Sequence, residues 1–405
     1  MPIELTAHTE AGARLVAVAE EISNQLAVRA GEHDRDGTYP FEAIDALRAA
    51  DYFAAPVPVE LGGLGVWSAH DLVVASSRLA RGDASVAIGV NMHLVAVLNM
   101  ERRRRVALAA GAERRAHGFA ASLERIARDG VVLAAAISEH GQDLTRPATV
   151  ATRTAAGWRI DGRKTFCTMS VAASHLYVSV TYADGDGGEQ YAYAMVPTDA
   201  SGVVINDDWD ALGMRASGSN SVLLTGVELP ETAVRGGFRA GDPLPYMERN
   251  LVGGLFHASA SLGIAESADQ IARKGTAGSG NGDARPRMQV ADNAIDLAAA
   301  RAVLSRAGAL IDRHRAANPG SDGSGEELDA LFAESQAAKA FVTEAAVRVV
   351  DRALALSGGA GYLNGNPLAR AYRDVKAASF MHPLAANRAY DHLARAALGE
   401  TTSLH

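Results

Sequence analysis

Two changes of hydrophobic periodicity along the 405 residues constrain the fold more than any other feature of this sequence. Before residue 130, apolar residues recur at helical spacing, as at Phe41, Ile44 and Leu47. Between Leu133 and Pro230 they alternate in short runs that Gly and Asp interrupt, which is typical of strands and turns. Helical spacing then returns. The pattern predicts a mainly α protein with a central β-domain, divided into a helical domain (1–130), a β-domain (131–235) and a helical bundle (236–405).

The charge distribution argues against nucleic-acid binding. The net formal charge is -8 and the basic residues are scattered, whereas phosphate backbones are bound by concentrated basic surfaces. The one basic run, from Arg102 to Arg105, is expected to form the solvated face of a helix. We therefore expect no nucleic-acid partner.

The single cysteine, Cys167, excludes an intramolecular disulfide and a cysteine-rich zinc site, and is expected to be a small buried apolar residue. The first ten residues lack a basic stretch followed by an apolar one, and no later segment is expected to reach the apolar length that spans a membrane. The sequence thus predicts a cytoplasmic protein with no membrane partner.

Several motifs occur in a fixed order along nearly the whole chain: Pro58 to Gly65 (PVELGGLG), Trp158 to Thr168 (WRIDGRKTFCT), Trp209 to Ser217 (WDALGMRAS), and Tyr372-Arg-Asp374 after Gly358 to Tyr362. In this order they resemble the acyl-CoA dehydrogenase family. The resemblance implies that family's fold, with an N-terminal helical domain, a middle β-barrel or sandwich and a C-terminal four-helix bundle. It also implies FAD, or FMN if the enzyme is a monooxygenase, and a homotetramer or dimer.

A flavin ring needs an apolar wall, hydrogen-bond donors at its polar edge and a cavity that excludes water. By resemblance to the family, Phe166 flanks the ring, Thr168 donates to its reactive edge, and Ser138 replaces a threonine that bonds the pyrimidine side. The alternative is that Phe166 is a core residue and Thr168 an ordinary strand residue, because β-branched residues favour strands.

Arg273 falls where the family places an arginine on the flavin pyrophosphate, a role that suits the fork of donors on a guanidinium. The alternative is a solvated helix residue. The sequence departs from the family nearby, because the Phe-Gly pair after this arginine is missing. Ala355 and Leu384 also replace a usual glutamine and threonine. These departures predict weaker flavin binding or altered flavin chemistry.

Dehydrogenation of an acyl thioester needs a carboxylate that removes the α-proton. The usual family position, eight residues after Asp374, holds His382 in this chain. A minority of the family carries the glutamate before an arginine on the first helix of the C-terminal bundle, where Glu248 and Arg249 stand here. Glu248 is then the base and Arg249 lies beside the ligand. The equally weighted alternative is a surface ion pair near a helix start.

His382 favours different chemistry. Family relatives that act as flavin monooxygenases lack the glutamate and line the cavity with histidines and other neutral polar groups, and a histidine can hydrogen-bond or deprotonate a substrate. His93 is a further candidate to face the cavity, although a lone histidine in an apolar helix is usually a core residue. The histidine spacings offer no set of ligands at metal geometry, so no metal is expected.

Three functions remain open at this point. The leading one is dehydrogenation of a CoA-linked or carrier-linked acyl thioester, with Glu248 as the base and a separate electron acceptor. The second is a monooxygenase, either a hydroxylase or an N-oxygenase, that acts on a small aromatic or amine substrate and is supplied by a flavin reductase. The third is a protein without catalysis. The fold alone does not choose among them.

Overall fold

The structure is a computed structural model that describes residues 3–141, 143–276, 284–400 and 404. The N-terminal part is helical, as predicted from its periodicity. It consists of α1 (Glu10–Asp36), α2 (Phe41–Ala49), the short 3-10 turns η1 (Tyr52–Ala54) and η2 (Val59–Leu61), α3 (Ala69–Gly82), α4 (Ala84–Ala109) and α5 (Glu113–Arg128).

The central part forms one sheet with strand order β6-β7-β3-β2-β4-β5-β8, and β1 pairs with β4. The β1–β4 and β2–β4 pairs are parallel and the others are antiparallel. The strands are β1 (Leu133–Ala136), β2 (Val150–Thr154), β3 (Gly157–Cys167), β4 (His175–Ala183), β5 (Glu189–Pro197), β6 (Val203–Ile205), β7 (Asn220–Pro230) and β8 (Val234–Arg239), with the 3-10 turn η3 (Glu231–Ala233) before β8.

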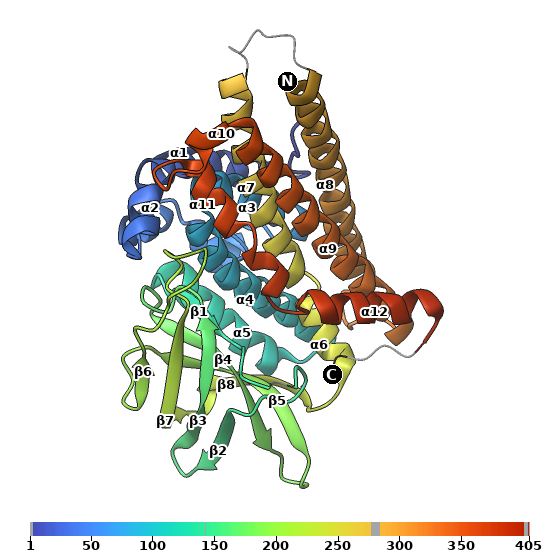
Figure 1. Ribbon diagram of the computed structural model, residues 1–405. Helices are drawn as coiled ribbons and strands as arrows, with labels where there is room; N and C mark the ends of the chain where they lie inside the picture. The colour runs from blue at the N-terminus through green and yellow to red at the C-terminus, as the bar shows by residue number, and fades with distance from the viewer. Residues whose placement is uncertain (1–2, 142, 277–283, 401–403, 405) are drawn as a thin grey trace.

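The C-terminal part is again helical. It contains α6 (Pro243–Asn250), α7 (Gly253–Thr276), α8 (Ala284–Ala317), α9 (Gly325–Leu356), α10 (Gly358–Gly361), α11 (Pro367–Asp374), the 3-10 turn η4 (Ala377–Phe380) and α12 (Ala386–Leu398). Figure 1 shows the sheet at one end of the molecule and the long helices α8 and α9 running toward the other end. In chain order, helical parts come before and after the strands, which confirms the predicted fold class. The predicted start of the helical bundle at residue 236 falls inside strand β8. The prediction missed the end of this strand because its two central glycines interrupt the alternation of apolar and polar residues.

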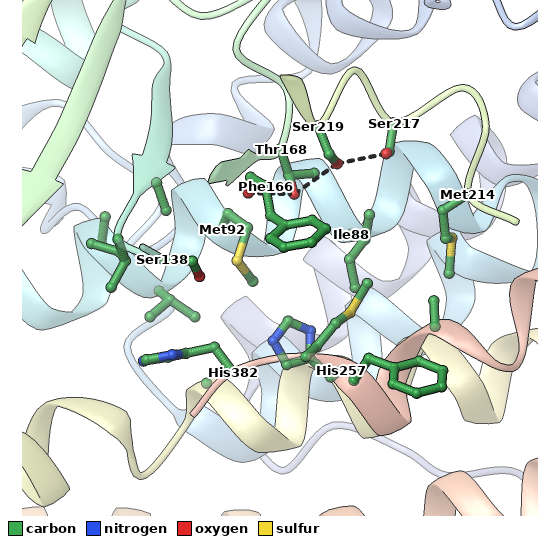
Figure 2. Close-up of a pocket in the computed structure, with 18 of the residues that line it drawn as sticks. Ile88, Met92, Ser138, Phe166, Thr168, Met214, Ser217, Ser219, His257 and His382 are labelled. Atoms are coloured by element: carbon green, nitrogen blue, oxygen red, sulfur yellow. Dashed lines mark hydrogen bonds between the residues drawn. The ribbon is translucent and has the colours of Figure 1, made fainter. Parts of the chain in front are cut away.

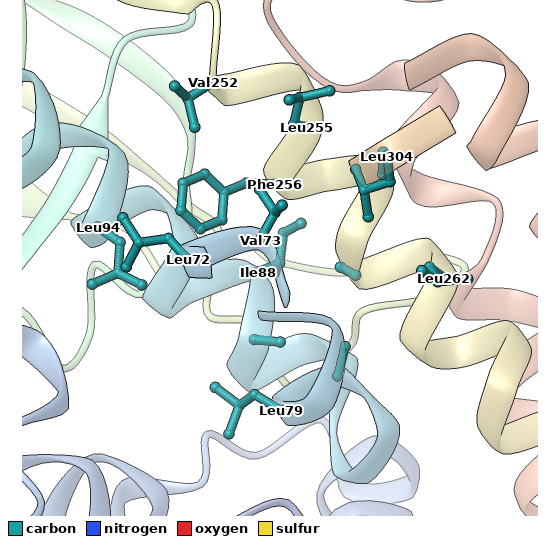
Figure 3. Close-up of a cluster of buried hydrophobic side chains, with 14 of the residues drawn as sticks. Leu72, Val73, Leu79, Ile88, Leu94, Val252, Leu255, Phe256, Leu262 and Leu304 are labelled. Atoms are coloured by element: carbon teal, nitrogen blue, oxygen red, sulfur yellow. The ribbon is translucent and has the colours of Figure 1, made fainter. Parts of the chain in front are cut away.

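The core lies where helices α3, α4 and α7 pack together. Leu72 and Val73 of α3 meet Phe256 of α7, with Leu94 of α4 beside them (Figure 3). Helices α3 and α7 approach closely, because a Cβ added to Gly263 would lie 2.3 Å from the carbonyl oxygen of Ser77. This packing fixes α4 and α7, both of which contribute to the cavity described below.

Helix α4 corrects the expectation that no segment reaches membrane-spanning apolar length. Ala84–Ala109 is long and apolar enough by length and composition, but 83% of its most apolar window is buried inside the protein. The helix is apolar because neighbouring helices surround it, and Asp83 caps its start by accepting hydrogen bonds from the backbone of Ser85 and Val86.

Candidate active site

A cavity of about 490 Å³ lies where the sheet meets helices α4, α7 and the segment around η4. We call it the central cavity. Most of its wall is apolar, and among its described lining residues there is no Asp or Glu. The predicted residues Ser138, Phe166, Thr168, Arg249 and His382 all line it. Residues that are far apart in the sequence therefore meet in one site (Figure 2).

Phe166 projects into the central cavity from the end of β3. The pairing of β3 with β7 shifts register between Lys164 and Cys167, and Phe166 has a φ of 54°, which is strained for an aromatic residue. Its side chain is 60% exposed, and its ring meets that of Trp209 edge to face at 6.1 Å. Phe166 is therefore no core residue, and backbone strain of this kind gathers at functional sites.

A chain of hydroxyl groups forms the wall beside Phe166. Ser219 donates a hydrogen bond of 3.0 Å to Thr168, and Ser217 lies 2.7 Å from Ser219 (Figure 2). Ser138 lies on the same cavity. A flavin ring requires an apolar surface and polar contacts. Phe166 and Trp209 offer the apolar surface, and these hydroxyl groups offer the polar contacts. The residues present therefore fit a flavin. Cys167, next to them, is buried as expected.

His382 is oriented by Tyr246 of α6, because the hydroxyl of Tyr246 lies 2.7 Å from Nε2 of His382. Burial raises the pKa of Tyr246 well above its usual value, so this hydroxyl keeps its proton and donates it. Burial, together with Lys339 and Arg388, lowers the pKa of His382 to about 3. The imidazole is thus neutral, with its remaining proton on Nδ1.

A second histidine, His257 of α7, lies on the opposite side of the cavity from Phe166 (Figure 2). Burial, with Lys339 and His382 nearby, holds the pKa of His257 well below its usual value. Lys339 of α9 donates hydrogen bonds to the carbonyl oxygens of Met381 and Leu384 and so fixes the segment that carries His382. Two neutral histidines therefore line this cavity, as the monooxygenase hypothesis expects.

Glu248 does not line the central cavity, although Arg249 does. The Glu248 side chain is 1% exposed and accepts hydrogen bonds from Arg103 at 2.6 Å and Arg102 at 3.2 Å, with Arg315 at 3.9 Å. Burial raises the pKa of Glu248, but Arg103, Arg315 and Arg102 outweigh it and lower the pKa to about 2. A carboxylate held in this way is a poor proton acceptor. The structure thus corrects the expectation that Glu248 is the base.

The basic run from Arg102 to Arg105, in the last turns of α4, is also not the solvated helix face expected from the sequence. The Arg102 side chain is 4% exposed and donates hydrogen bonds to Glu248 and to the carbonyl oxygens of Asn318 and Ser321. Arg104 and Arg105 both bind the buried carboxylate of Glu101. The run is turned inward because it neutralises two buried glutamates.

His93 and Arg273 lie away from the cavity lining. His93 is fully buried, accepts a hydrogen bond from the backbone of Leu133 and bonds the carbonyl oxygen of Phe53, which is the core role given as its alternative. Arg273 pairs with Asp269 at 2.7 Å near the end of α7. At 1.5 Å per residue it lies about 30 Å along the helix from Gly253, which lines the cavity.

Among the described residues, one group of metal-binding type, His8, His70 and Asp71, has ligand atoms within 4.8 Å of one another. These side chains are engaged in other contacts. Asp71 accepts hydrogen bonds from the backbone of His8 and Thr9, and His70 contacts Asp71 and Ser305. The group attaches the start of α1 to α3 and needs no metal to explain it.

The sequence matches known family profiles over most of its length. Residues 10–102, 133–227 and 247–382 match the N-terminal, middle and C-terminal domains of acyl-CoA dehydrogenase. The fold and the central cavity define a flavin-dependent oxidoreductase. The chain belongs to the acyl-CoA dehydrogenase family.

Its relatives span both chemistries considered above. The chain is 33% identical to the amino sugar nitrososynthase DnmZ of Streptomyces peucetius, over 96% of this chain and 94% of that protein. It is 31% identical to the putative acyl-CoA dehydrogenase YdbM of Bacillus subtilis (strain 168), over 90% and 91%. The solved structure of KijD3 in complex with FMN and dTDP-3-amino-2,3,6-trideoxy-4-keto-3-methyl-D-glucose has a TM-score of 0.87 and 30% identity, over 98% of this chain and 96% of that chain.

Proposed function

We propose that this protein is a flavin-dependent monooxygenase that oxygenates the amine nitrogen of a small substrate, and that it is not an acyl-thioester dehydrogenase. One observation carries the proposal: no carboxylate lines the described part of the central cavity, and Glu248, the candidate base, is bound to arginines outside it. Proton abstraction next to a thioester needs such a group. The similarity to an amino sugar nitrososynthase supports the amine as the substrate group.

The electrostatics of the cavity favour a neutral amine. Its charged lining residues are the cations Arg249, Lys376 and Arg373, of which Arg373 is paired with Asp34, and its histidines are uncharged. A cationic, apolar surrounding disfavours an ammonium ion and lowers the pKa of a bound amine. The amine then presents the free electron pair that attack on activated oxygen requires, while Nδ1 of His382 and the ring of His257 can hydrogen-bond the substrate.

Several residues would hold the flavin in this cavity. Phe166 and Trp209 would cover the ring, and Ser138 and Thr168 would bond its polar edge. Lys376 offers positive charge to the flavin phosphate, whereas the guanidinium of Arg373 is already paired with Asp34. The flavin, once reduced by a separate reductase, activates molecular oxygen. We propose FMN as the cofactor in preference to FAD, because the related KijD3 structure contains FMN.

We further propose that the protein is a cytoplasmic homo-oligomer, a tetramer or a dimer. The C-terminal part carries large exposed apolar side chains, among them Met288 and Ile295 of α8 and Tyr362 after α10, which contact between subunits would cover. In an oligomer, Arg273 would be available to the flavin of a neighbouring subunit, as the family resemblance implies. A monomer by light scattering at micromolar concentration would contradict this assembly.

The test of the proposed reaction compares how the bound flavin becomes reduced. Without oxygen, a panel of acyl thioesters should leave the bound flavin oxidised. In air, a flavin reductase with NADH should supply reduced flavin, and the protein should then consume oxygen only when an amine substrate is present. Rapid bleaching by any thioester would favour the dehydrogenase reading. If the protein binds neither FMN nor FAD at high concentration, both the monooxygenase and the dehydrogenase functions are ruled out.

A further inference from the structure

The segment that joins β6 to β7, residues 206–219, forms part of the wall of the central cavity, and we call it the β6–β7 segment. It contributes Trp209, Met214, Ser217 and Ser219 to the lining (Figure 2). The segment contains no helix or strand. No regular ladder of backbone hydrogen bonds therefore fixes its shape, and other contacts must do so.

The backbone of Met214 is the centre of these contacts. Its carbonyl oxygen accepts a hydrogen bond of 2.9 Å from the indole of Trp209 and one of 3.0 Å from the backbone N–H of Ser217. Met214 has a φ of 52°, in the left-handed region that residues with a side chain rarely adopt. The position of this backbone sets both Trp209, which meets Phe166 edge to face, and Ser217, which belongs to the chain of hydroxyl groups.

Asp374, at the end of α11, binds this backbone from outside the cavity. Its carboxylate accepts a hydrogen bond of 2.6 Å from the backbone N–H of Met214. Asp374 is 4% exposed and does not line the cavity. The two segments approach closely because residue 213 is a glycine: a Cβ added to Gly213 would lie 2.4 Å from the carbonyl oxygen of Arg373. Helix α11 therefore supports the wall that carries Trp209.

The carboxylate of Asp374 stands where a charge is unfavourable. Burial raises the pKa of Asp374 to about 7, with a further contribution from Asp83 and Asp34. The backbone N–H of Met214 and the guanidinium of Arg370 lower the pKa but do not outweigh the burial. Ionisable groups that are perturbed in this way gather at functional sites. Burial of a carboxyl group here therefore suggests a role beyond stability.

We propose that Asp374 is a positioning residue for the flavin. By fixing the backbone of Met214, it holds Trp209 against the flavin ring and Ser217 in the chain of hydroxyl groups that bonds the polar edge of the ring. The position of the flavin rests on the proposed function. Asp374 acts only through Met214, because it does not reach the cavity itself.

The experiment measures the Kd for FMN by quenching of flavin fluorescence. Asp374→Ala should raise the Kd about tenfold, the effect of one lost hydrogen bond to a charged group. Asp374→Asn keeps an oxygen that can accept from Met214 and should stay close to the wild type. Asp71→Ala is the matched control, because Asp71 is also buried, accepts backbone N–H groups of His8 and Thr9, and does not line the cavity. It should lower the free energy of unfolding but leave the Kd unchanged.

A second readout needs no flavin. The chain contains three tryptophans, so labelling with 5-fluorotryptophan should give three fluorine NMR signals, and Trp209→Phe identifies the signal of Trp209. In the protein without flavin, this signal should shift or broaden in Asp374→Ala and should keep its position in Asp374→Asn and Asp71→Ala. A merely structural role of Asp374 would not single out Trp209.

Three results would overturn the inference: an equal Kd for FMN in Asp374→Ala and Asp71→Ala, binding as weak in Asp374→Asn as in Asp374→Ala, or an unchanged Trp209 signal in Asp374→Ala. If Asp374→Ala does not fold, Gly213→Ala gives another measure, because its Cβ pushes the β6–β7 segment away from α11. Gly185→Ala, where a Cβ meets nothing within 4 Å, is its control. A protein that binds FMN in this Asp374-dependent way but oxygenates no amine would refute the proposed function and leave the role of Asp374 standing.

Discussion

Glu248 and Arg249 are neighbours on α6, yet only Arg249 lines the central cavity, while the carboxylate of Glu248 lies 2.6 Å from Nη2 of Arg103. Successive residues on a helix point about 100° apart, so neighbours in sequence can serve different sites. Glu248 joins α6 to α4 and, through Arg315, faces α8. Its role is therefore structural.

Replacing Glu248 by Gln should destabilise the protein and should not act through lost proton abstraction. The substitution leaves Arg102, Arg103 and Arg315 without their shared carboxylate, and breaking a buried ion pair typically costs roughly 3–5 kcal/mol. Urea unfolding measures the loss. Glu334→Gln, at an exposed pair with Arg306, should cost less than about 1 kcal/mol. Equal stability of the two variants would show that the arginine cluster does not depend on Glu248.

The same carboxylate predicts acid sensitivity. The folded-state pKa of Glu248 is about 2, below its ordinary value of 4.5, so the unfolded chain binds the proton first as the pH falls. The stabilisation is complete above about pH 4.5 and is lost as the pH falls toward 2. The free energy of unfolding, measured between pH 6 and pH 3, should fall less steeply in Glu248→Gln than in the wild type. Parallel curves would contradict the prediction.

Removing the hydroxyl of Tyr246 should affect turnover more than binding. Tyr246→Phe leaves Nε2 of His382 without its donor, so the ring loses its fixed tautomer and orientation. We expect kcat to fall roughly tenfold with KM and flavin affinity unchanged, and His382→Gln to cost roughly a hundredfold. Tyr390→Phe, whose hydroxyl contacts Glu344 at the surface, serves as the control. A Tyr246→Phe enzyme with normal kcat would rule out this positioning role.

Phe166→Ala should weaken flavin binding without loss of stability. The side chain is 60% exposed, so its removal loses little core contact, but it does remove the apolar wall of the proposed flavin site. We expect the Kd for FMN to rise about tenfold, which corresponds to about 1.4 kcal/mol. Quenching of flavin fluorescence measures the Kd, and Phe41→Ala, at another exposed phenylalanine, should leave it unchanged. Equal values for both variants would place the flavin elsewhere.

Much of the architecture could be predicted from the sequence, because hydrophobic periodicity is local. The family motifs also singled out Ser138, Phe166, Thr168, Arg249 and His382, which the structure brings together in one cavity. The predictions failed where the outcome depended on partners distant in sequence. A basic run normally lies in solvent, and nothing local to Arg102 or Arg103 reveals the carboxylate that they bind across the fold.

His257 and Lys339 could not be predicted for a related reason. His257 stands in an apolar helix, where a histidine is usually a core residue, and only the folded structure reveals that it lines the central cavity. Lys339 is buried in α9 and holds the segment of His382 through carbonyl oxygens, which leave no trace in residue identity.

Isotopically labelled oxygen gas tests most directly whether the protein transfers an oxygen atom to an amine. The protein is incubated under the labelled gas with FMN, a flavin reductase, NADH and the dTDP-linked amino sugar present in the KijD3 structure. The products are then separated and weighed by mass spectrometry. We expect a product that carries labelled oxygen on the amine nitrogen and is absent when the protein or the amine is omitted. An unlabelled amine, together with flavin that an acyl thioester reduces without oxygen, would contradict it.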